Sequence, residues 1–124
     1  MSSKTLILRK IGRFYQAFDD DALIMSYLFN YKVINYRCGF PISSINKVIE
    51  KLEELNINYI LKQEEEIEKD FKRKNNYLKY LDKSKLKDSI NNRIHNILNK
   101  LDKLDKNKLE ELLTTIEDLV YENL

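Results

Sequence analysis

Glycine and proline disappear from the chain well before its middle, and neither residue occurs after Gln63. Beyond that residue, apolar side chains recur only at helical spacing, and the alternation typical of strands is absent. We therefore predict an α+β fold. Residues 1–63 should form a small mixed sheet with packed helices, and residues 64–124 should form an all-helical hairpin or bundle containing nothing but helix.

The first part has three segments with the composition of strands. β-Branched, aliphatic or aromatic residues predominate in residues 5–8, 31–35 and 59–61. Gly12 permits a turn or bulge after the first segment. Cys38–Pro41 is predicted to be a turn that follows the second segment.

Two helices are predicted between these strands. Asp19–Asp21 offer N-cap and first-turn carboxylates for a helix that ends at about Asn30. Ser43 or Ser44 caps the next helix, which ends at about Asn56. This second helix has one apolar face, formed by Ile45, Val48, Ile49, Leu52 and Leu55. The order β-α-β-α-β predicts a small sheet with helices packed against it.

Three amphipathic helices are predicted after residue 63. Their apolar stripes are Ile67, Phe71, Leu78 and Leu81; Leu86, Ile90, Ile94, Ile97, Leu98 and Leu101; and Leu109, Leu112, Leu113, Ile116, Leu119 and Val120. Ser84 is a candidate cap for the second helix, and Asp105 or Asn107 begins the third. Because such stripes must be covered, we expect the tail to dock on a partner or to form a homo-oligomer.

Residue types that catalysis and metal binding require are scarce. His95 is the only histidine and Cys38 the only cysteine, and neither has a partner at ligand or triad spacing. There is no P-loop, dinucleotide fingerprint or HExxH motif. We therefore predict a protein that is not an enzyme and that has no metal site and no cofactor. A single cysteine, no signal peptide and no apolar run of about 20 residues predict a cytoplasmic protein without a membrane partner.

Positive charge is concentrated between Lys69 and Lys87, where eight basic residues stand against two acidic ones. Such a block is either a solvated helix face or a surface that binds phosphates. The candidate phosphate contacts, which are interleaved with Tyr77 and Tyr80, are Lys69, Lys72, Arg73, Lys74 and Lys79.

The stretch "LRKIGRFYQAFDD" places two consecutive aromatic residues between Arg13 and Gln16. These aromatics could pack a strand-to-helix corner, or they could stack on bases. Composition alone leaves both readings open.

Two stretches, "LILRKIGRFYQAFDDDA" and "CGFPISSINKVIEKLEELNINYILKQ", resemble the N-terminal, mismatch-recognition domain of MutS proteins. That family has an apolar strand, Met-Gly-Asp-Phe-Tyr-Glu-Leu-Phe, and an acidic helix start with Asp-Asp-Ala. Ala-Gly-Ile-Pro follows before a helix, and a last strand ends in Gln. The matching positions here are Gly12, Phe14, Tyr15, Phe18, Asp20, Asp21, Ala22, Gly39, Pro41, Lys51, Leu52 and Gln63. The likeness covers about Lys4 to Gln63, without clamp, lever or ATPase, so we expect a detached recognition domain with its own helical tail.

The resemblance implies roles for three residues. In MutS proteins the Phe of Phe-X-Glu wedges beside the mispaired base and the Glu hydrogen-bonds it, which assigns these roles to Phe14 and Gln16. Arg13 replaces an aspartate, so the loop is three charge units more positive than the family pattern. Higher general affinity for nucleic acid and weaker mismatch discrimination should follow. Tyr15 and Phe18 are expected to be core.

Small MutS-like proteins of this kind are similar to the accessory proteins of reverse transcriptases in diversity-generating retroelements. Three functions therefore stay open. The first is a DNA- or RNA-binding accessory of a polymerase, specifically such a reverse transcriptase. The second is a helical interaction module whose MutS-like half is a scaffold. The third is a standalone sensor of mismatched or unusual DNA.

Overall fold

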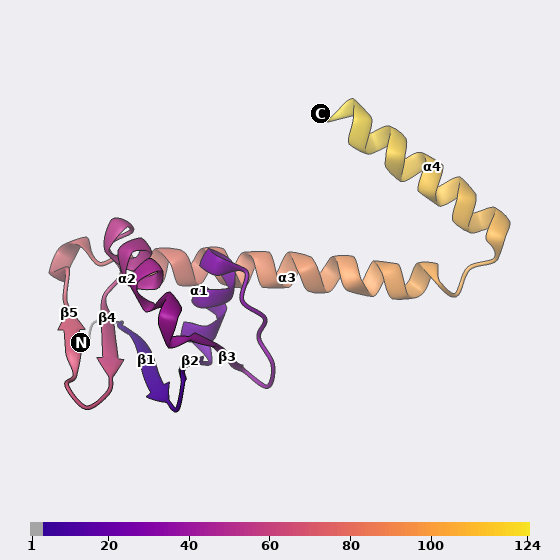
Figure 1. The fold of residues 1–124 in the computed structure, drawn as a ribbon. Helices are drawn as coiled ribbons and strands as arrows, with labels where there is room; N and C mark the ends of the chain where they lie inside the picture. The colour runs from indigo at the N-terminus through magenta and orange to yellow at the C-terminus, as the bar shows by residue number, and fades with distance from the viewer. Residues whose placement is uncertain (1–3) are drawn as a thin grey trace. The chain divides into compact units, whose positions relative to one another are not determined.

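The computed structural model describes residues 4–124. Its strands and helices are shown in Figure 1 and follow the order β1 (Leu6–Ile11), β2 (Phe14–Phe18), α1 (Asp20–Phe29), β3 (Arg37–Pro41), α2 (Ile45–Glu54), β4 (Tyr59–Lys62), β5 (Ile67–Lys69), α3 (Tyr77–Leu101) and α4 (Lys106–Glu122). Short 3-10 helices occupy Ile42–Ser44 and Lys72–Lys74. The chain divides into two compact units, and the boundary falls within α3, between Asp88 and Ser89. Each unit is described by itself.

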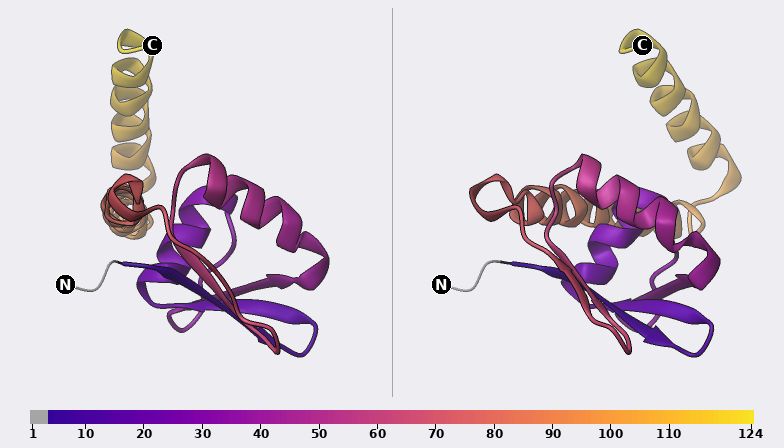
Figure 2. Two further views of the ribbon diagram at one scale, coloured as in Figure 1. Left: turned by 90° about the vertical axis from the view of Figure 1, so that its left-hand side faces the viewer. Right: turned by 60° about the vertical axis from the view of Figure 1, so that its left-hand side comes forward.

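The first unit is built on a mixed five-stranded sheet with the strand order β3-β2-β1-β4-β5. β1 lies at the centre, parallel to β4 and antiparallel to β2, and the two edge strands are antiparallel to their neighbours. α1 and α2 lie over one face of this sheet, and no element of residues 4–88 covers the other face (Figure 2). The predicted α+β fold, with a mixed sheet and packed helices followed by a helical tail, is confirmed.

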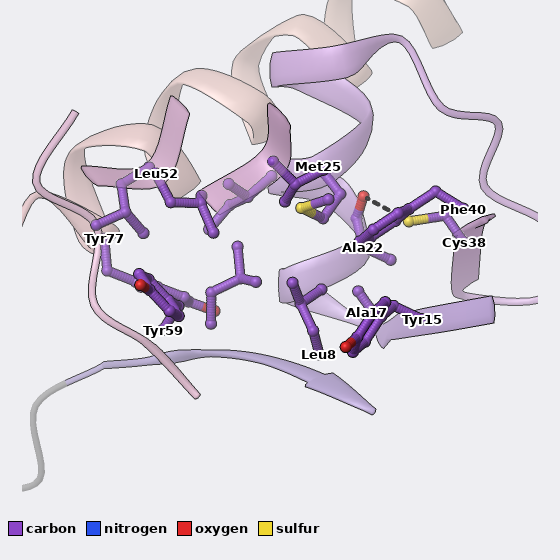
Figure 3. Packing of buried hydrophobic residues seen from close by; sticks show 14 of the residues in the cluster. Leu8, Tyr15, Ala17, Ala22, Met25, Cys38, Phe40, Leu52, Tyr59 and Tyr77 are labelled. Atoms are coloured by element: carbon purple, nitrogen blue, oxygen red, sulfur yellow. Dashed lines mark hydrogen bonds between the residues drawn. The ribbon is translucent and has the colours of Figure 1, made fainter. Parts of the chain in front are cut away.

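The core lies between the sheet and its helices. Side chains alternate between the two faces of a strand, so every second strand residue is buried. These are Leu6 and Leu8, Tyr15 and Ala17, Cys38 and Phe40, and Tyr59 and Leu61. They pack against Ala22, Ile24 and Met25 of α1 and against Val48 and Leu52 of α2 (Figure 3). Aromatic rings extend the core, because Phe40 stacks on Tyr15 at 5.7 Å and on Tyr31 at 5.5 Å between centroids.

The start of α3 belongs to the same core. Tyr77, Leu81 and Ser84 are buried, and Tyr77 hydrogen-bonds Asp21 of α1. The loop before α3 is fastened by Asn58, whose side chain donates to Asp70 at 3.0 Å and accepts from the Phe71 N–H at 2.7 Å. The sheet unit therefore continues well past residue 63.

Two predictions in the first part are wrong. Residues 31–35 do not form a strand. Asn35 and Tyr36 have positive φ, and a tight turn there is closed by hydrogen bonds between Ile34 and Arg37. The predicted turn at Cys38–Pro41 is instead strand β3, in which Cys38 and Phe40 are the buried positions. Proline is tolerated there because β3 is an edge strand.

The prediction that nothing but helix follows Gln63 is also wrong. β5 pairs with β4, and Ile67 and Phe71 are not part of a helix. Ser84 does not begin a helix but lies inside α3, where its hydroxyl donates to the Leu81 carbonyl at 2.8 Å. The third predicted helix is confirmed as α4, and the Asp105 carboxylate caps it by accepting from the Lys108 N–H at 3.0 Å. The predicted strands at β1 and β4 and the helices α1 and α2 are confirmed.

Candidate nucleic-acid interface

The β1–β2 hairpin places the first three candidate residues. Gly12 and Arg13 form its two-residue turn, and Ile11 pairs with Phe14 across it. Gly12 has φ 62°, the left-handed conformation that such turns need at their first position. The Arg13 side chain is therefore exposed at the tip, and Phe14 begins the returning strand.

Phe14 and Gln16 lie on the helix-free face of the sheet. Tyr15 and Ala17 are buried, so alternation turns the residues on either side of Tyr15 to the opposite face. The Phe14 side chain is 50% exposed and Gln16 is half-buried. Of the two readings of the aromatic pair, core packing holds for Tyr15, as predicted, and does not hold for Phe14. Phe18, which was predicted to be core, is half-buried on the helix-free face.

Buried contacts hold this strand in place. Tyr15 stacks on Phe40 and donates its hydroxyl hydrogen to Gln63 Oε1 at 2.5 Å (Figure 3). The Arg13 carbonyl accepts from the Ile42 N–H at 3.0 Å, which ties the hairpin tip to the residue after β3. Phe14 is thus presented by a strand whose neighbouring side chain is anchored in the core.

The helix-free face of the sheet is called the open face below. It is formed by Ile7, Arg9, Ile11, Phe14, Gln16, Phe18, Arg37, Gly39, Pro41, Ile60, Lys62 and Glu68, which are exposed or half-buried. Strand register sets Gln16 beside Gly39 on one side and beside Arg9 on the other. Arg9 is in turn beside Lys62 of β4.

The basic candidates after residue 63 are exposed but are spread over three elements. Lys69 ends β5 and its Nζ lies 5.7 Å from the centre of the Phe71 ring. Lys72, Arg73 and Lys74 form a 3-10 helix. Lys79 is on α3, where its Nζ lies 5.8 Å from the Tyr80 ring centre.

The structure does not bring this basic group and the hairpin tip together. The loop that carries Lys72 is fastened to Asn58, whose carbonyl also accepts from the N–H of Leu6 at the beginning of β1. Arg13 and Phe14 follow the other end of β1, a strand of six residues that spans about 20 Å. They are therefore two separate candidate surfaces.

Sequence reasoning missed several residues beside both surfaces. On the open face these are Arg9, Phe18, Arg37 and Lys62. On α3, Lys83 and Lys87 lie 5.2 Å and 5.6 Å from the ring centres of Tyr80 and Tyr27. The spacing of four residues from Lys79 to Lys83 to Lys87 was a signal that could have identified this row.

The two residues considered for catalysis have unremarkable surroundings. Cys38 is buried, its Sγ donates to the Ala22 carbonyl at 3.8 Å, and burial raises the pKa of the thiol to about 11. The thiolate that a nucleophile needs is therefore disfavoured. His95 is exposed on α3. Within residues 4–124, no group of three or more His, Cys, Asp or Glu side chains is placed to hold a metal ion. No helix in the same range is long and apolar enough to cross a membrane.

Comparison with protein families gives one finding. The family model of MutS domain I matches residues 1–98, which include the sheet unit and most of α3. A search of curated proteins finds no significant match.

Proposed function

The chain belongs to the MutS domain I family, and we propose that it is a non-enzymatic protein that binds nucleic acid through Arg13, Phe14 and Gln16. MutS domain I is a non-catalytic domain that recognises mismatched DNA. DNA is therefore the first ligand to test, and RNA is the second.

The observation that carries this proposal is the position of Phe14 and Gln16 on one exposed sheet face. A half-exposed ring beside the hairpin tip can stack on a base, which contributes about 1–3 kcal/mol per base. The Gln16 amide has both a donor and an acceptor for a base edge. Arg13 adds a cation at the tip, within reach of phosphate oxygens.

A polymerase is the protein partner that we propose, specifically the reverse transcriptase of a diversity-generating retroelement. The support is indirect. A more basic loop without the family's carboxylate fits an accessory that tolerates mismatches while a template is copied. The exposed apolar side chains of α3 and α4, among them Ile94, Ile97 and Ile116, offer a surface for such a partner.

Two alternatives have their own support. The same apolar side chains of α3 and α4 would serve a helical interaction module or a homo-oligomer. A standalone mismatch sensor is favoured by the pairing of Phe14 and Gln16 on one face, since these positions match the family's Phe-X-Glu.

Fluorescence anisotropy over a range of salt concentrations separates these functions. The labelled probes are single-stranded DNA, single-stranded RNA, a DNA–RNA hybrid, and matched and mismatched DNA duplexes. We expect salt-dependent binding with little preference for the mismatch, and Gln16→Glu should weaken general binding while restoring some mismatch preference. No binding to any probe would leave only the interaction module.

Affinity purification from the native host, with nuclease treatment, tests the partner. A polymerase retained after nuclease digestion supports the accessory role. Recovery of the protein with no polymerase contradicts that role.

A further inference from the structure

We propose that the open face as a whole binds a single, unpaired nucleic-acid strand, and that Arg9, Phe18 and Lys62 extend the site formed by Phe14 and Gln16. This inference rests on the proposed function and names its substrate class. It concerns residues that lie two strands away from the hairpin tip and that neither the sequence motif nor the family match singles out.

The open face is a continuous surface of the sheet unit. Each of its strands directs every second side chain into the core and the others outward, and α1 and α2 lie on the core side (Figure 2). Ile11 and Phe14 are 49% and 50% exposed although both are large and apolar. A contiguous exposed apolar surface of this kind is typical of a binding site.

Charge identifies the occupant as a polyanion. Arg9 and Lys62 are adjacent across the β1–β4 ladder, and two like charges in such positions destabilise a sheet. Within residues 4–124 the ion pairs are Lys51–Glu54 and Lys62–Glu66, so Arg9 has no acidic partner there. Arg37 adds a third cation at the edge, against the single carboxylate of Glu68 on the same face. Phosphates would relieve this repulsion.

The arrangement of rings identifies the ligand as unpaired. Phe14, Gln16 and Phe18 alternate with buried residues along β2, so an amide lies between two rings that are about 13 Å apart along the strand. A duplex encloses the faces of its bases, whereas a single strand exposes them for stacking on aromatic side chains of a sheet. Two rings on one flat face therefore suit an unpaired strand.

Gly39 leaves room beside the amide. It pairs with Gln16 on the neighbouring strand, and a Cβ at this position would lie 3.5 Å from Gln16 Cγ and 3.4 Å from the Tyr15 carbonyl oxygen. Because Gly39 has no side chain, a base edge can approach Gln16 from that side. Arg9 borders Gln16 on the other side and can reach a phosphate of the same strand.

Binding of a labelled oligothymidylate of about 12 nucleotides, a length within the range that single-strand sites cover, tests the inference on the full chain. The variant is Arg9→Gln with Lys62→Gln, and the control is Lys47→Gln with Lys106→Gln, which removes the same charge from exposed positions of α2 and α4. We expect weaker binding by the variant only. The slope of log K against log salt concentration should fall by about 1.4, or 0.7 for each phosphate contact. Thermal melting should show both variants folded.

The outcomes separate the two proposals. If Phe14→Ala weakens binding while Arg9→Gln with Lys62→Gln matches its control, the site is confined to the hairpin tip and this inference is overturned. If wild type binds a matched duplex as tightly as the single strand, and the variant weakens both equally, the unpaired ligand is overturned. If wild type is a dimer without nucleic acid and Ile11→Ser makes it monomeric, the face is a contact between copies. If wild type binds no probe, the proposed function itself fails.

Discussion

The Tyr77 hydroxyl, at the start of α3, donates a hydrogen bond of 2.6 Å to the Asp21 carboxylate of α1. The same carboxylate accepts from the Ile7 N–H of β1 at 3.1 Å, so one side chain joins the sheet, α1 and α3. Burial raises the pKa of Asp21, against the opposing effect of these two hydrogen bonds. Burial, and then its bond to Asp21, raises the pKa of Tyr77. The start of α3 is thereby fixed to the sheet unit.

Tyr77→Phe should lower the free energy of unfolding by about 1–3 kcal/mol at pH 8, because a buried carboxylate loses its donor. A Tyr whose pKa is raised by folding contributes stability that is complete below its unfolded pKa, about 10, and is lost as pH rises through the folded pKa. The difference between wild type and variant should therefore shrink above pH 10. Urea unfolding at pH 8 and pH 11 measures it.

Tyr27→Phe is the matched control, because the Tyr27 hydroxyl has no hydrogen-bond partner within residues 4–124. Its effect should stay within about 0.5 kcal/mol. An equal loss in the two variants would contradict the role of the Tyr77–Asp21 bond.

Truncation tests where the sheet unit ends. A chain that stops at Gln63 lacks β5 and the buried side chains of Tyr77 and Leu81. Burial of two such side chains contributes about 3–6 kcal/mol, which is comparable with the whole stability of a small domain. We expect cooperative melting, followed by circular dichroism, for a chain that ends at Asp88 and not for one that ends at Gln63. Equal melting of the two would show that α3 is dispensable to the fold.

The sequence predicted those elements whose signals are local, and it missed those that depend on pairing. β1 and α2 were predicted from their own composition and apolar spacing. β3 was taken for a turn because Gly39 and Pro41 are turn formers, and its strand conformation comes from pairing with β2. β5 has only three residues, which is too short for alternation to be recognised.

The candidate site was predictable to the same extent. Phe14 and Gln16 came from the family motif, and the buried alternation of β2 explains why both point the same way. Arg9 and Lys62 could not be paired from the sequence, because only the parallel β1–β4 ladder brings them together. The separation of the hairpin tip from Lys72 likewise depends on the tertiary fold.

Gly39→Val should weaken binding of the single strand without loss of thermal stability. The added Cβ meets its neighbours at ordinary contact distances, and valine favours strands, so the fold should tolerate it. Its methyl groups would occupy the space beside Gln16. Anisotropy and melting on the same preparation provide the measurement, and unchanged affinity in a folded variant would show that no base approaches Gln16 from β3.

The apolar stripe of α4 should mediate association with a second copy or a partner. Leu112 and Ile116 are 43% and 42% exposed. Leu112→Glu with Ile116→Glu should make an associated chain monomeric in sedimentation velocity, whereas Asn107→Glu with Thr114→Glu, on the polar face, should not. A wild-type chain that sediments as a monomer, and that recovers no protein partner from cells, would contradict this prediction.

Phe14→Ala, studied by paired binding and melting measurements, tests the central claim most directly. Loss of a stacked base should weaken binding by about 1–3 kcal/mol, roughly 5- to 150-fold, at every salt concentration. Melting should change little because half of the ring is exposed. Tyr121→Ala, which removes an exposed ring from α4, should change neither quantity, and Arg13→Ala should reduce binding mainly at low salt. If Phe14→Ala instead destabilises the fold by about 3–5 kcal/mol, as truncation of a core aromatic does, and Arg13→Ala leaves binding unchanged, the nucleic-acid interface does not exist.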